Sequence, residues 1–418
     1  MKKYIFDKKY LPHRMLAGFI LGIVFGAIFT DISLTIKPLG TLFMDLIKML
    51  IVPVIFFSVT SGIAAIGDVH KLKRVGSKVV LVYTVMTIFA AILGIIVAAI
   101  IRPGKGFTME GASNFDASNV TTPDFLAFFF EMVPTNIVEA MSTGNVMQII
   151  FFSFIFGIAL VLLGEKANLV TKFVDQSANV IYRMLDIVMI YAPIGVFALM
   201  ANTVAEYGSQ LFGAMFKFIA AVWIGDLFIW IILSVFAALY SGVKYSYLCK
   251  SMLPIWANTM ATTSSAGTIP ITMDVTTKKL GIPHSIASFS IPLGATINLT
   301  GAALWKTVLA VFVADMYSIS FTPAQFVLIV LISTIMSIAA PGIPGGGIVT
   351  GAIFLNLLGL PLELMGLIVG MYRLLDMANT TVNVSGDVLG TMIVAKNEKL
   401  WNPKKIDFDK EAQYEASK

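Results

Sequence analysis

Charged residues are scarce in this chain. Only 13% of its 418 residues are charged, 57% are hydrophobic, and the mean hydropathy is +0.87. An average soluble domain has about 25% charged residues. A chain with so little charge cannot cover a water-exposed surface in the usual way. The composition therefore excludes an ordinary soluble domain and predicts a polytopic membrane protein.

Cysteine and histidine are also scarce. The chain has one cysteine, Cys249, which excludes an internal disulfide and any metal or redox motif built on several cysteines. It has three histidines, two of which stand among basic residues, so a histidine metal site is not expected. A serine hydrolase needs a base beside its nucleophile. Ser264 and Ser265 have only His284 near them in sequence, beyond a turn, so we do not expect an enzyme.

The net charge of +5 reflects topology rather than nucleic-acid binding. Basic residues cluster between apolar runs, at residues 2–14, 70–78, 166–172, 244–250 and 396–405. By the positive-inside rule these segments are cytoplasmic. The apolar run after the first cluster has no signal cleavage site and predicts a first transmembrane helix. We expect a multi-pass protein of the plasma (inner) membrane, surrounded by lipid, with cytoplasmic N- and C-termini and no nucleic-acid partner.

Apolar runs of about 20 residues, enough to cross the hydrocarbon core, recur along the chain. Six of them precede residue 250, at residues 15–30, 42–66, 79–101, 125–163, 180–204 and 211–240. The fourth run is broken at Val133-Pro-Thr-Asn136. The long hydrophilic stretch between the third and fourth runs, residues 105–123, is expected outside the cell.

Two later stretches combine short apolar segments with a small, polar tip. Their tips are residues 261–270, rich in Ser and Thr, and residues 337–347, rich in Gly and Pro. Non-helical backbone at membrane depth is tolerated only where protein or a watery cavity surrounds it, so each stretch predicts a re-entrant hairpin. A pair of interrupted segments points to a transporter binding site. Ordinary loops are the alternative, but their flanks would be less apolar.

A seventh span between these stretches, at residues 291–302, is expected to open in mid-membrane. Pro292, Gly294 and Gly301 interrupt its helical pattern. An opened helix frees carbonyl oxygens, and an all-oxygen site suits a hard cation such as sodium. The side chains that would complete this site are those of Thr296, Asn298, Asn383 and Asp387.

The last apolar stretch carries a polar stripe. At about 100° per residue, Asp376, Thr380, Asn383 and Asp387 share one helical face, and the opposite face is apolar. Ionisable groups at bilayer depth are costly and usually mark a substrate or ion path. Alternatively, the two carboxyl groups are neutralised partners in a packed bundle. Two carboxyl groups, an amide and a hydroxyl are more than packing needs.

Together these motifs resemble the dicarboxylate/amino acid:cation symporter family, the glutamate transporter homologues. The two tips, the segment Ile291-Pro-Leu-Gly-Ala-Thr-Ile-Asn298 and the stripe from Asp376 to Asp387 occur in the family's order, and the Val133 break and Pro193 match as well. The resemblance implies an all-α integral membrane protein with eight transmembrane helices plus two re-entrant helical hairpins. It also implies a homotrimer that works as an elevator-type secondary active transporter.

The resemblance divides the chain into functional parts. Residues 1–75, with spans one and two, and residues 104–208, with the extracellular loop and spans four and five, would form a fixed scaffold. Residues 76–103, with span three, and residues 209–397, with span six, the first hairpin, span seven, the second hairpin and span eight, would form a moving transport domain. Residues 398–418 would be a cytoplasmic tail.

The resemblance also assigns site residues. Asp376 would bind the amino group of the substrate. The implied substrate site consists of Thr263, Ser264, Ser265, Ile343, Gly347, Asp376, Asn379, Thr380 and Asn383. One sodium would be bound by Asn298, Asn383, Asp387 and carbonyls near Gly294, and a second, under the second hairpin, by Thr296, Ser337 and Ile338.

One departure from the family concerns the substrate. Members that carry acidic substrates have an arginine where this chain has Asn379, so a second substrate carboxylate would stay unpaired at a cost of roughly several kcal/mol. This favours sodium-coupled import of a small neutral amino acid such as alanine, serine or threonine. An acidic amino acid, aspartate or glutamate, is the alternative, because Arg373 could reach the pocket. Pairing of Arg373 with Asp376 at i,i+3 is favoured over that contact.

A second departure concerns the cations. Thr300 replaces a sodium-binding aspartate of the family, and Met86, with a thioether that binds hard cations poorly, replaces a threonine. We expect one or two sodium ions and the loss of the third family site. Lys306 stands where eukaryotic relatives have a proton-accepting glutamate, so it could replace a cation or carry a proton, unless it snorkels to an interface. An anion channel is less expected, because a pore needs symmetric rings of ligands.

Overall fold

The computed structural model describes residues 11–64, 75–106, 133–207, 210–338, 340 and 345–403. These residues are almost entirely helical and contain no strand, so the all-α prediction is confirmed. Four helical stretches in the described part are long and apolar enough to cross a membrane, namely Ser77–Ile101, Gln148–Glu206, Gly213–Ser241 and Ile286–Met316. They indicate a multi-pass membrane protein. The total of eight spans stays a prediction.

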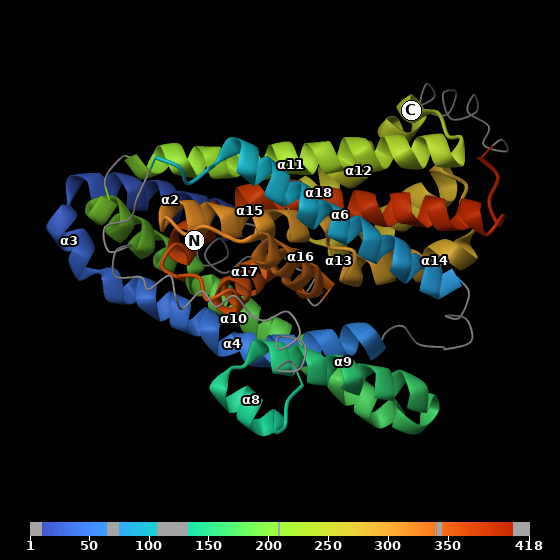
Figure 1. The fold of residues 1–418 in the computed structure, drawn as a ribbon, viewed down its shortest axis with the longest axis horizontal. Coiled ribbons are helices and arrows are strands. Elements are labelled where there is room, and N and C mark those ends of the chain that lie inside the picture. The colour runs from blue at the N-terminus through green and yellow to red at the C-terminus, as the bar shows by residue number, and fades with distance from the viewer. Residues whose placement is uncertain are drawn as a thin grey trace, which may run out of the picture.

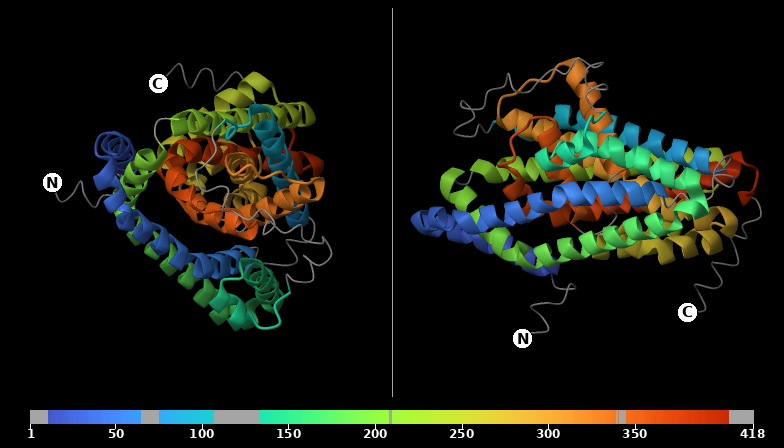
Figure 2. Two further views of the ribbon diagram at one scale, coloured as in Figure 1. Left: turned by 60° about the vertical axis from the view of Figure 1, so that its left-hand side comes forward. Right: turned by 90° about the horizontal axis from the view of Figure 1, so that it is seen from below.

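Helices from two parts of the chain form a first group. They are α2 (Leu11–Ile28), α3 (Thr30–Thr35), α4 (Lys37–Ala64), α8 (Ile137–Thr143), α9 (Val146–Leu163) and α10 (Asn168–Tyr207). The long α10 packs along both α2 and α4, and α9 packs against α4 (Figure 1). Figure 2 shows these helices along one side of the molecule, beside the remaining helices.

Glycines on α2 let it approach α10 closely. Gly18, Gly22 and Gly26 are four residues apart and therefore lie on one helical face. A Cβ atom at Gly22 would lie 2.6 Å from the carbonyl oxygen of Phe197, and the other two glycines meet successive turns of α10 in the same way. Small residues at this spacing are typical of close packing between membrane helices.

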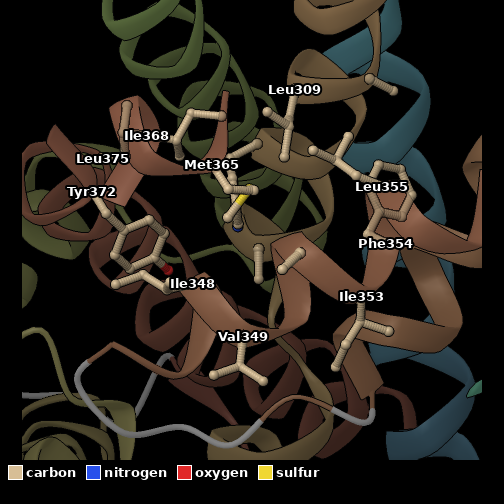
Figure 3. Packing of buried hydrophobic residues seen from close by; sticks show 14 of the residues in the cluster. Leu309, Ile348, Val349, Ile353, Phe354, Leu355, Met365, Ile368, Tyr372 and Leu375 are labelled. Carbon is tan, nitrogen blue, oxygen red and sulfur yellow. The ribbon is translucent and has the colours of Figure 1, made fainter. Parts of the chain in front are cut away.

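The other helices form a second group. They are α6 (Ser77–Ile101), α11 (Gln210–Ser241), α12 (Tyr245–Thr262), α13 (Ser265–Asp274), α14 (His284–Ile297), α15 (Thr300–Met316), α16 (Pro323–Ile338), α17 (Gly346–Leu357) and α18 (Met365–Asn397). α15 is enclosed by its neighbours, and α6 lies along it. Figure 3 shows the apolar core that α15, α17 and α18 share, with Leu309, Phe354 and Ile368 among its buried side chains.

An ion pair fixes one end of α6 against α15. Arg102, directly after α6, donates hydrogen bonds to the carboxylate of Asp315 at 2.6 and 2.9 Å. These hydrogen bonds, together with the negative charge of Asp315, raise the pKa of Arg102. The adjacent Gly104 packs on the last turns of α15, where a Cβ atom would lie 2.7 Å from that of Asp315. The pair therefore stabilises the contact between two helices that border the polar site.

Each predicted hairpin tip separates two helices that pack against each other. The first helix pair, α12 and α13, turns at Thr263 and Ser264, where Thr263 has φ +48°. Such a backbone is unusual for a β-branched residue, and strain of this kind clusters at functional sites. The second helix pair is α16 and α17, and tip residues 341–344, including Ile343, lie outside the described residues. A re-entrant position in the membrane stays a prediction for both pairs.

The predicted interruption of the seventh span is present between α14 and α15. Asn298 and Leu299 leave the helical conformation, four residues beyond Gly294. The amide of Asn298 still donates to the carbonyl of Gly294 at 2.8 Å. Gly301 packs directly on the backbone of Asn379 in α18. The interrupted helix therefore opens beside the polar stripe.

The ends of the apolar runs in the sequence differ from the observed ends of the helices. α10 extends over 40 residues, although its predicted run covers 180–204. Polar residues at its start, such as Asp175 and Gln176, end the apolar run but do not end the helix, because they favour helix well enough when exposed. The break at 133–136 precedes α8, where Asn136 accepts hydrogen bonds from the amides of Val138 and Glu139 as an N-cap. The rest of the fourth run before this break lies outside the described residues.

Gly301→Ala should destabilise the fold. The new Cβ atom would lie 2.6 Å from the carbonyl oxygen of Asn379, so α15 and α18 would have to move apart at a cost of roughly 1–3 kcal/mol. The measurement is the midpoint of thermal unfolding of the purified protein in detergent. Gly213→Ala is the control, because no atom lies within 4 Å of its Cβ position. Equal midpoints for the two variants would contradict this packing.

Candidate functional site

The polar face of α18 is buried between the two helix pairs and the interrupted helix. Its side chains are those of Asp376, Asn379, Thr380, Asn383 and Asp387, all at most 8% exposed. α18 packs against α11, α12, α14, α15 and α17. The predicted stripe therefore points into the second group of helices, where neighbouring backbone and side chains can reach it.

Asp376 collects hydrogen bonds from its own helix and from the second helix pair. Its Oδ1 atom accepts from the hydroxyls of Tyr372 at 3.3 Å and Thr380 at 3.2 Å. The backbone amide of Gly345, directly before α17, also donates to this carboxylate. The residues at the start of α17 therefore lie beside Asp376 and Tyr372.

Tyr372 was missed by the sequence analysis. A Cβ atom at Gly347 would overlap its hydroxyl, so only a glycine fits at the start of α17. Its ring meets that of Trp305 edge to face, with centroids 5.3 Å apart. Figure 3 shows its hydroxyl beside Ile348. Tyr372 lies four residues before Asp376, and this helical spacing is the signal that could have identified it.

Arg373 reaches the tip of the first helix pair. Its guanidinium donates to the hydroxyl of Thr263 and to the carbonyls of Ala261 and Thr262, at the C-terminal end of α12. A cation is favourable there because the helix dipole is negative. Within the described residues Arg373 forms no ion pair with Asp376, although the two charges interact through space. The guanidinium thus lies between the first tip and Asp376.

Asp387 lies in an oxygen-rich cluster at the opening between α14 and α15. Asn298 donates from Nδ2 to Asp387 Oδ1 at 2.9 Å and to the Asn383 carbonyl at 3.4 Å. The side-chain oxygen of Asn383 accepts from the amide of Gly301 at 2.7 Å. A Cβ atom at Gly294 would lie 2.5 Å from Asp387 Oδ1, so the carboxylate rests on the backbone of α14. One carboxylate, amide oxygens and carbonyls are ligands that suit a hard cation.

Met86 and Thr300, the two departures from the family that predict the loss of a cation site, lie close together. A Cβ atom at Gly386 would be 3.4 Å from both the methyl group of Met86 and the hydroxyl of Thr300. The Thr300 hydroxyl donates to Asn298 Oδ1 at 2.9 Å. An apolar methyl group and a neutral hydroxyl therefore stand beside Asn298, where neither supplies a negative charge.

Lys306 contacts one of the residues expected to hold a second cation. Its ammonium donates to the carbonyl of Ala302 at 3.1 Å and to the hydroxyl of Ser337, in α16, at 3.2 Å. Lys306 is fully buried, so it does not snorkel to an interface. Of the other expected ligands, Thr296 donates its hydroxyl to Leu293 at 2.7 Å, and Ile338 ends α16.

The remaining predicted residues divide between the first tip and α18. Ser264 is the N-cap of α13 and accepts from the amide of Gly267 at 3.0 Å, while Ser265 is buried in the first turn. Asn379 is 1% exposed, and neither its amide nitrogen nor its oxygen has a hydrogen-bond partner. An unpaired buried amide is costly and needs an explanation. Ile343 lies outside the described residues.

Comparisons with known proteins agree on one family. The model of the sodium:dicarboxylate symporter family matches residues 11–397. The chain is 31% identical over 402 residues to the proton/glutamate-aspartate symporter of Bacillus subtilis (strain 168), covering 95% of this chain and 97% of that protein. It is 33% identical over 406 residues to the proton/sodium-glutamate symport protein of Bacillus caldotenax, covering 94% and 96%. It is also 32% identical over 417 residues to the C4-dicarboxylate transport protein of Bacillus subtilis (strain 168), covering 98% and 96%.

Tyr372→Phe should loosen the second tip. The hydroxyl holds Asp376 near Gly347, and a hydrogen bond to a charged group contributes about 1.5–3 kcal/mol. We expect faster hydrogen–deuterium exchange of the backbone amides at residues 345–350, measured by mass spectrometry. The control is Tyr247→Phe, which removes a hydroxyl bonded to the Lys279 carbonyl at 2.7 Å, in the first turn of α12. Unchanged exchange in Tyr372→Phe would show that the hydroxyl does not hold the tip.

Proposed function

This chain belongs to the sodium:dicarboxylate symporter family, a family of transporters and not of enzymes, and we propose that it imports a small acidic amino acid together with sodium. The prediction of a neutral substrate is revised. The relatives named above are glutamate, glutamate-aspartate and C4-dicarboxylate transporters, which favours the acidic alternative. The observation that carries the proposal is the position of Arg373 between the first tip and Asp376.

Arg373 supplies the cation that Asn379 lacks. An arginine binds a carboxylate through two parallel hydrogen bonds, and such charge-assisted pairs are strong. The partners of Arg373 in the structure are a hydroxyl and carbonyls of the first tip, which a substrate carboxylate can replace as guanidinium ligands. Asp376 then pairs with the amino group of the same substrate. A C4-dicarboxylate without an amino group would not need Asp376, so the proposal favours an amino acid.

A neutral amino acid is the second candidate. Asn379 supports it, because its buried amide has no partner and could bind a hydroxyl side chain such as that of serine or threonine. A site built to hydrogen-bond a substrate hydroxyl discriminates strongly against analogues that lack it. The two candidates therefore differ in which of Arg373 and Asn379 contacts the substrate side chain.

The coupling cation is proposed to bind at the Asp387 cluster. Asp387 supplies a carboxylate there, and Asn298, Asn383 and the backbone of Gly294 surround it. Their amide and carbonyl oxygens would complete the oxygen ligands that a sodium site needs. A second sodium under the second hairpin would use Thr296, Ser337 and Ile338. We propose that the Lys306 ammonium, which donates to Ser337, replaces the cation of the lost third site.

In the proposed transport mechanism, one of the two helix groups stays fixed and the other moves. The first group, within residues 1–75 and 104–208, would be the fixed scaffold of a homotrimer in the plasma membrane. The second group, within residues 76–103 and 209–397, would be the transport domain that moves as an elevator. In this account both helix pairs are re-entrant hairpins, the second is the extracellular gate, and both termini, including the tail at 398–418, are cytoplasmic.

Arg373→Gln tests the substrate assignment. Wild-type protein in proteoliposomes with an inward sodium gradient should take up labelled aspartate faster than labelled alanine. The variant should lose aspartate uptake by roughly tenfold or more, because truncating one partner of a buried charge pair costs about 2–5 kcal/mol. Arg183→Gln is the control, since that side chain is largely exposed on α10. Faster uptake of alanine, unchanged in Arg373→Gln, would establish the neutral candidate instead.

Lys306→Gln tests the proposed cation replacement. Removing a buried charge beside a cation site should change the sodium concentration for half-maximal uptake by about tenfold or more, since buried charges interact with energies of several kcal/mol. Uptake measured across a series of sodium concentrations gives this value. Lys217→Gln, an exposed lysine on α11, should leave it unchanged. An unaltered sodium dependence in Lys306→Gln would eliminate this role.

A further inference from the structure

Asp226 is a buried acidic group that the proposed sites do not use. It lies in the middle of α11, a 32-residue helix, among apolar neighbours in sequence. Its residue surface is 2% exposed, and neither carboxyl oxygen has a hydrogen-bond partner. Asp376 and Asp387 each accept hydrogen bonds from neighbouring groups, so Asp226 differs from the two carboxyl groups of the polar stripe.

Asp226 is close to the substrate site. Tyr372 donates a hydrogen bond to Asp376 and lies within the electrostatic reach of Asp226. One turn before Asp226, Trp223 donates to the carbonyl of Leu374 at 3.0 Å, which holds this part of α11 against α18. The side chain next to Tyr372 on α15 is Trp305, whose buried indole N–H also has no partner.

The positively charged side chains on neighbouring helices bond to partners other than Asp226. Arg373 on α18 bonds to the first tip, and Lys306 on α15 bonds to Ser337. The titratable groups on the other helices packed against α11 are also engaged elsewhere. On α6, Tyr83 donates to the carbonyls of Ser290 and Asp387, and on α12, Tyr245 contacts Ser234 and Trp230.

A carboxylate without a partner in such surroundings is very unfavourable as an anion, and groups of this kind bind a proton instead. Ionisable residues inside membrane segments commonly form proton pathways. In the structure, Asp226 is buried and its carboxyl oxygens have no hydrogen-bond partner. A rearrangement that exposes Asp226 to water would let its carboxyl group release the proton.

We propose that Asp226 is a proton-binding site and that proton binding at Asp226 is coupled to substrate binding. This inference rests on the proposed acidic substrate. An acidic amino acid adds one net negative charge near Tyr372, which favours a proton on Asp226. By thermodynamic reciprocity, the proton favours binding of the anionic substrate. The proton adds to a carboxyl oxygen as the substrate enters and leaves to water as the substrate leaves, and no bond in the substrate changes.

The first test measures proton uptake on binding. Aspartate is added to purified wild-type protein in weakly buffered sodium solution that contains a pH indicator. We expect the solution to become more alkaline in proportion to the site occupied by aspartate. Aspartate binding without any pH change would overturn the proposal while leaving the proposed function intact. Absence of aspartate binding would overturn the proposed function, and with it this inference.

The second test uses a matched pair of variants. Asp226→Asn imitates the protonated group, so it should bind aspartate without proton uptake, and its apparent aspartate affinity should no longer depend on pH. In the wild type this affinity should fall by about fivefold or more from acid to alkaline pH, a typical size for coupling between two sites. Asp274→Asn, which removes an exposed partner of Lys278, should behave like the wild type. If the aspartate affinity of Asp226→Asn depends on pH as strongly as that of the wild type, the assignment is wrong. If Asp226→Asn does not fold, the proton-uptake measurement on the wild-type protein decides the question.

Discussion

Carboxyl groups enclosed by apolar helices need hydrogen-bond partners, and this requirement organises the second group of helices. Asp376 takes its partners from α18 and from the tip before α17. Asp387 takes its partner from the opening between α14 and α15. The regular helix α18 supplies the side chains of Tyr372 and Thr380, but it cannot supply free backbone groups, because its backbone donors and acceptors are already paired. The interruptions of the fold therefore lie where the polar stripe of α18 needs them.

The half-buried Arg373 and the buried Lys306 follow the same logic. Arg373 and Lys306 each satisfy carbonyl and hydroxyl oxygens at an end or interruption of a helix. Each also lies beside a group proposed to bind the substrate or a cation. In the proposed function, Arg373 would pair with an anionic group of the substrate and Lys306 would replace one mobile cation. The proposed coupling of substrate and cation therefore depends on the balance of positive and negative charges around the polar stripe of α18.

Local composition predicted the polar stripe, the two tips and the interruption of the seventh span, because each depends on residues close together in sequence. The direction of Arg373 could not be predicted, since it depends on the position of the first tip, more than 100 residues earlier. Tyr372 could have been identified from its helical spacing to Asp376. The electrostatic interaction between Asp226 and Tyr372 depends on the packing of α11 against α18, so sequence alone could not find it. The neutral-substrate prediction followed from Asn379 and from the expectation that Arg373 pairs with Asp376, whereas Arg373 bonds to the first tip.

The central claim is that one enclosed site binds an acidic amino acid and sodium together. Isothermal titration calorimetry of the purified protein with aspartate, in sodium and in choline solutions of equal ionic strength, tests it most directly. The account predicts saturable aspartate binding in sodium and an affinity at least about tenfold weaker in choline, which corresponds to about 1.4 kcal/mol of coupling. Equal affinities in the two solutions, or binding of alanine but not aspartate, would contradict it.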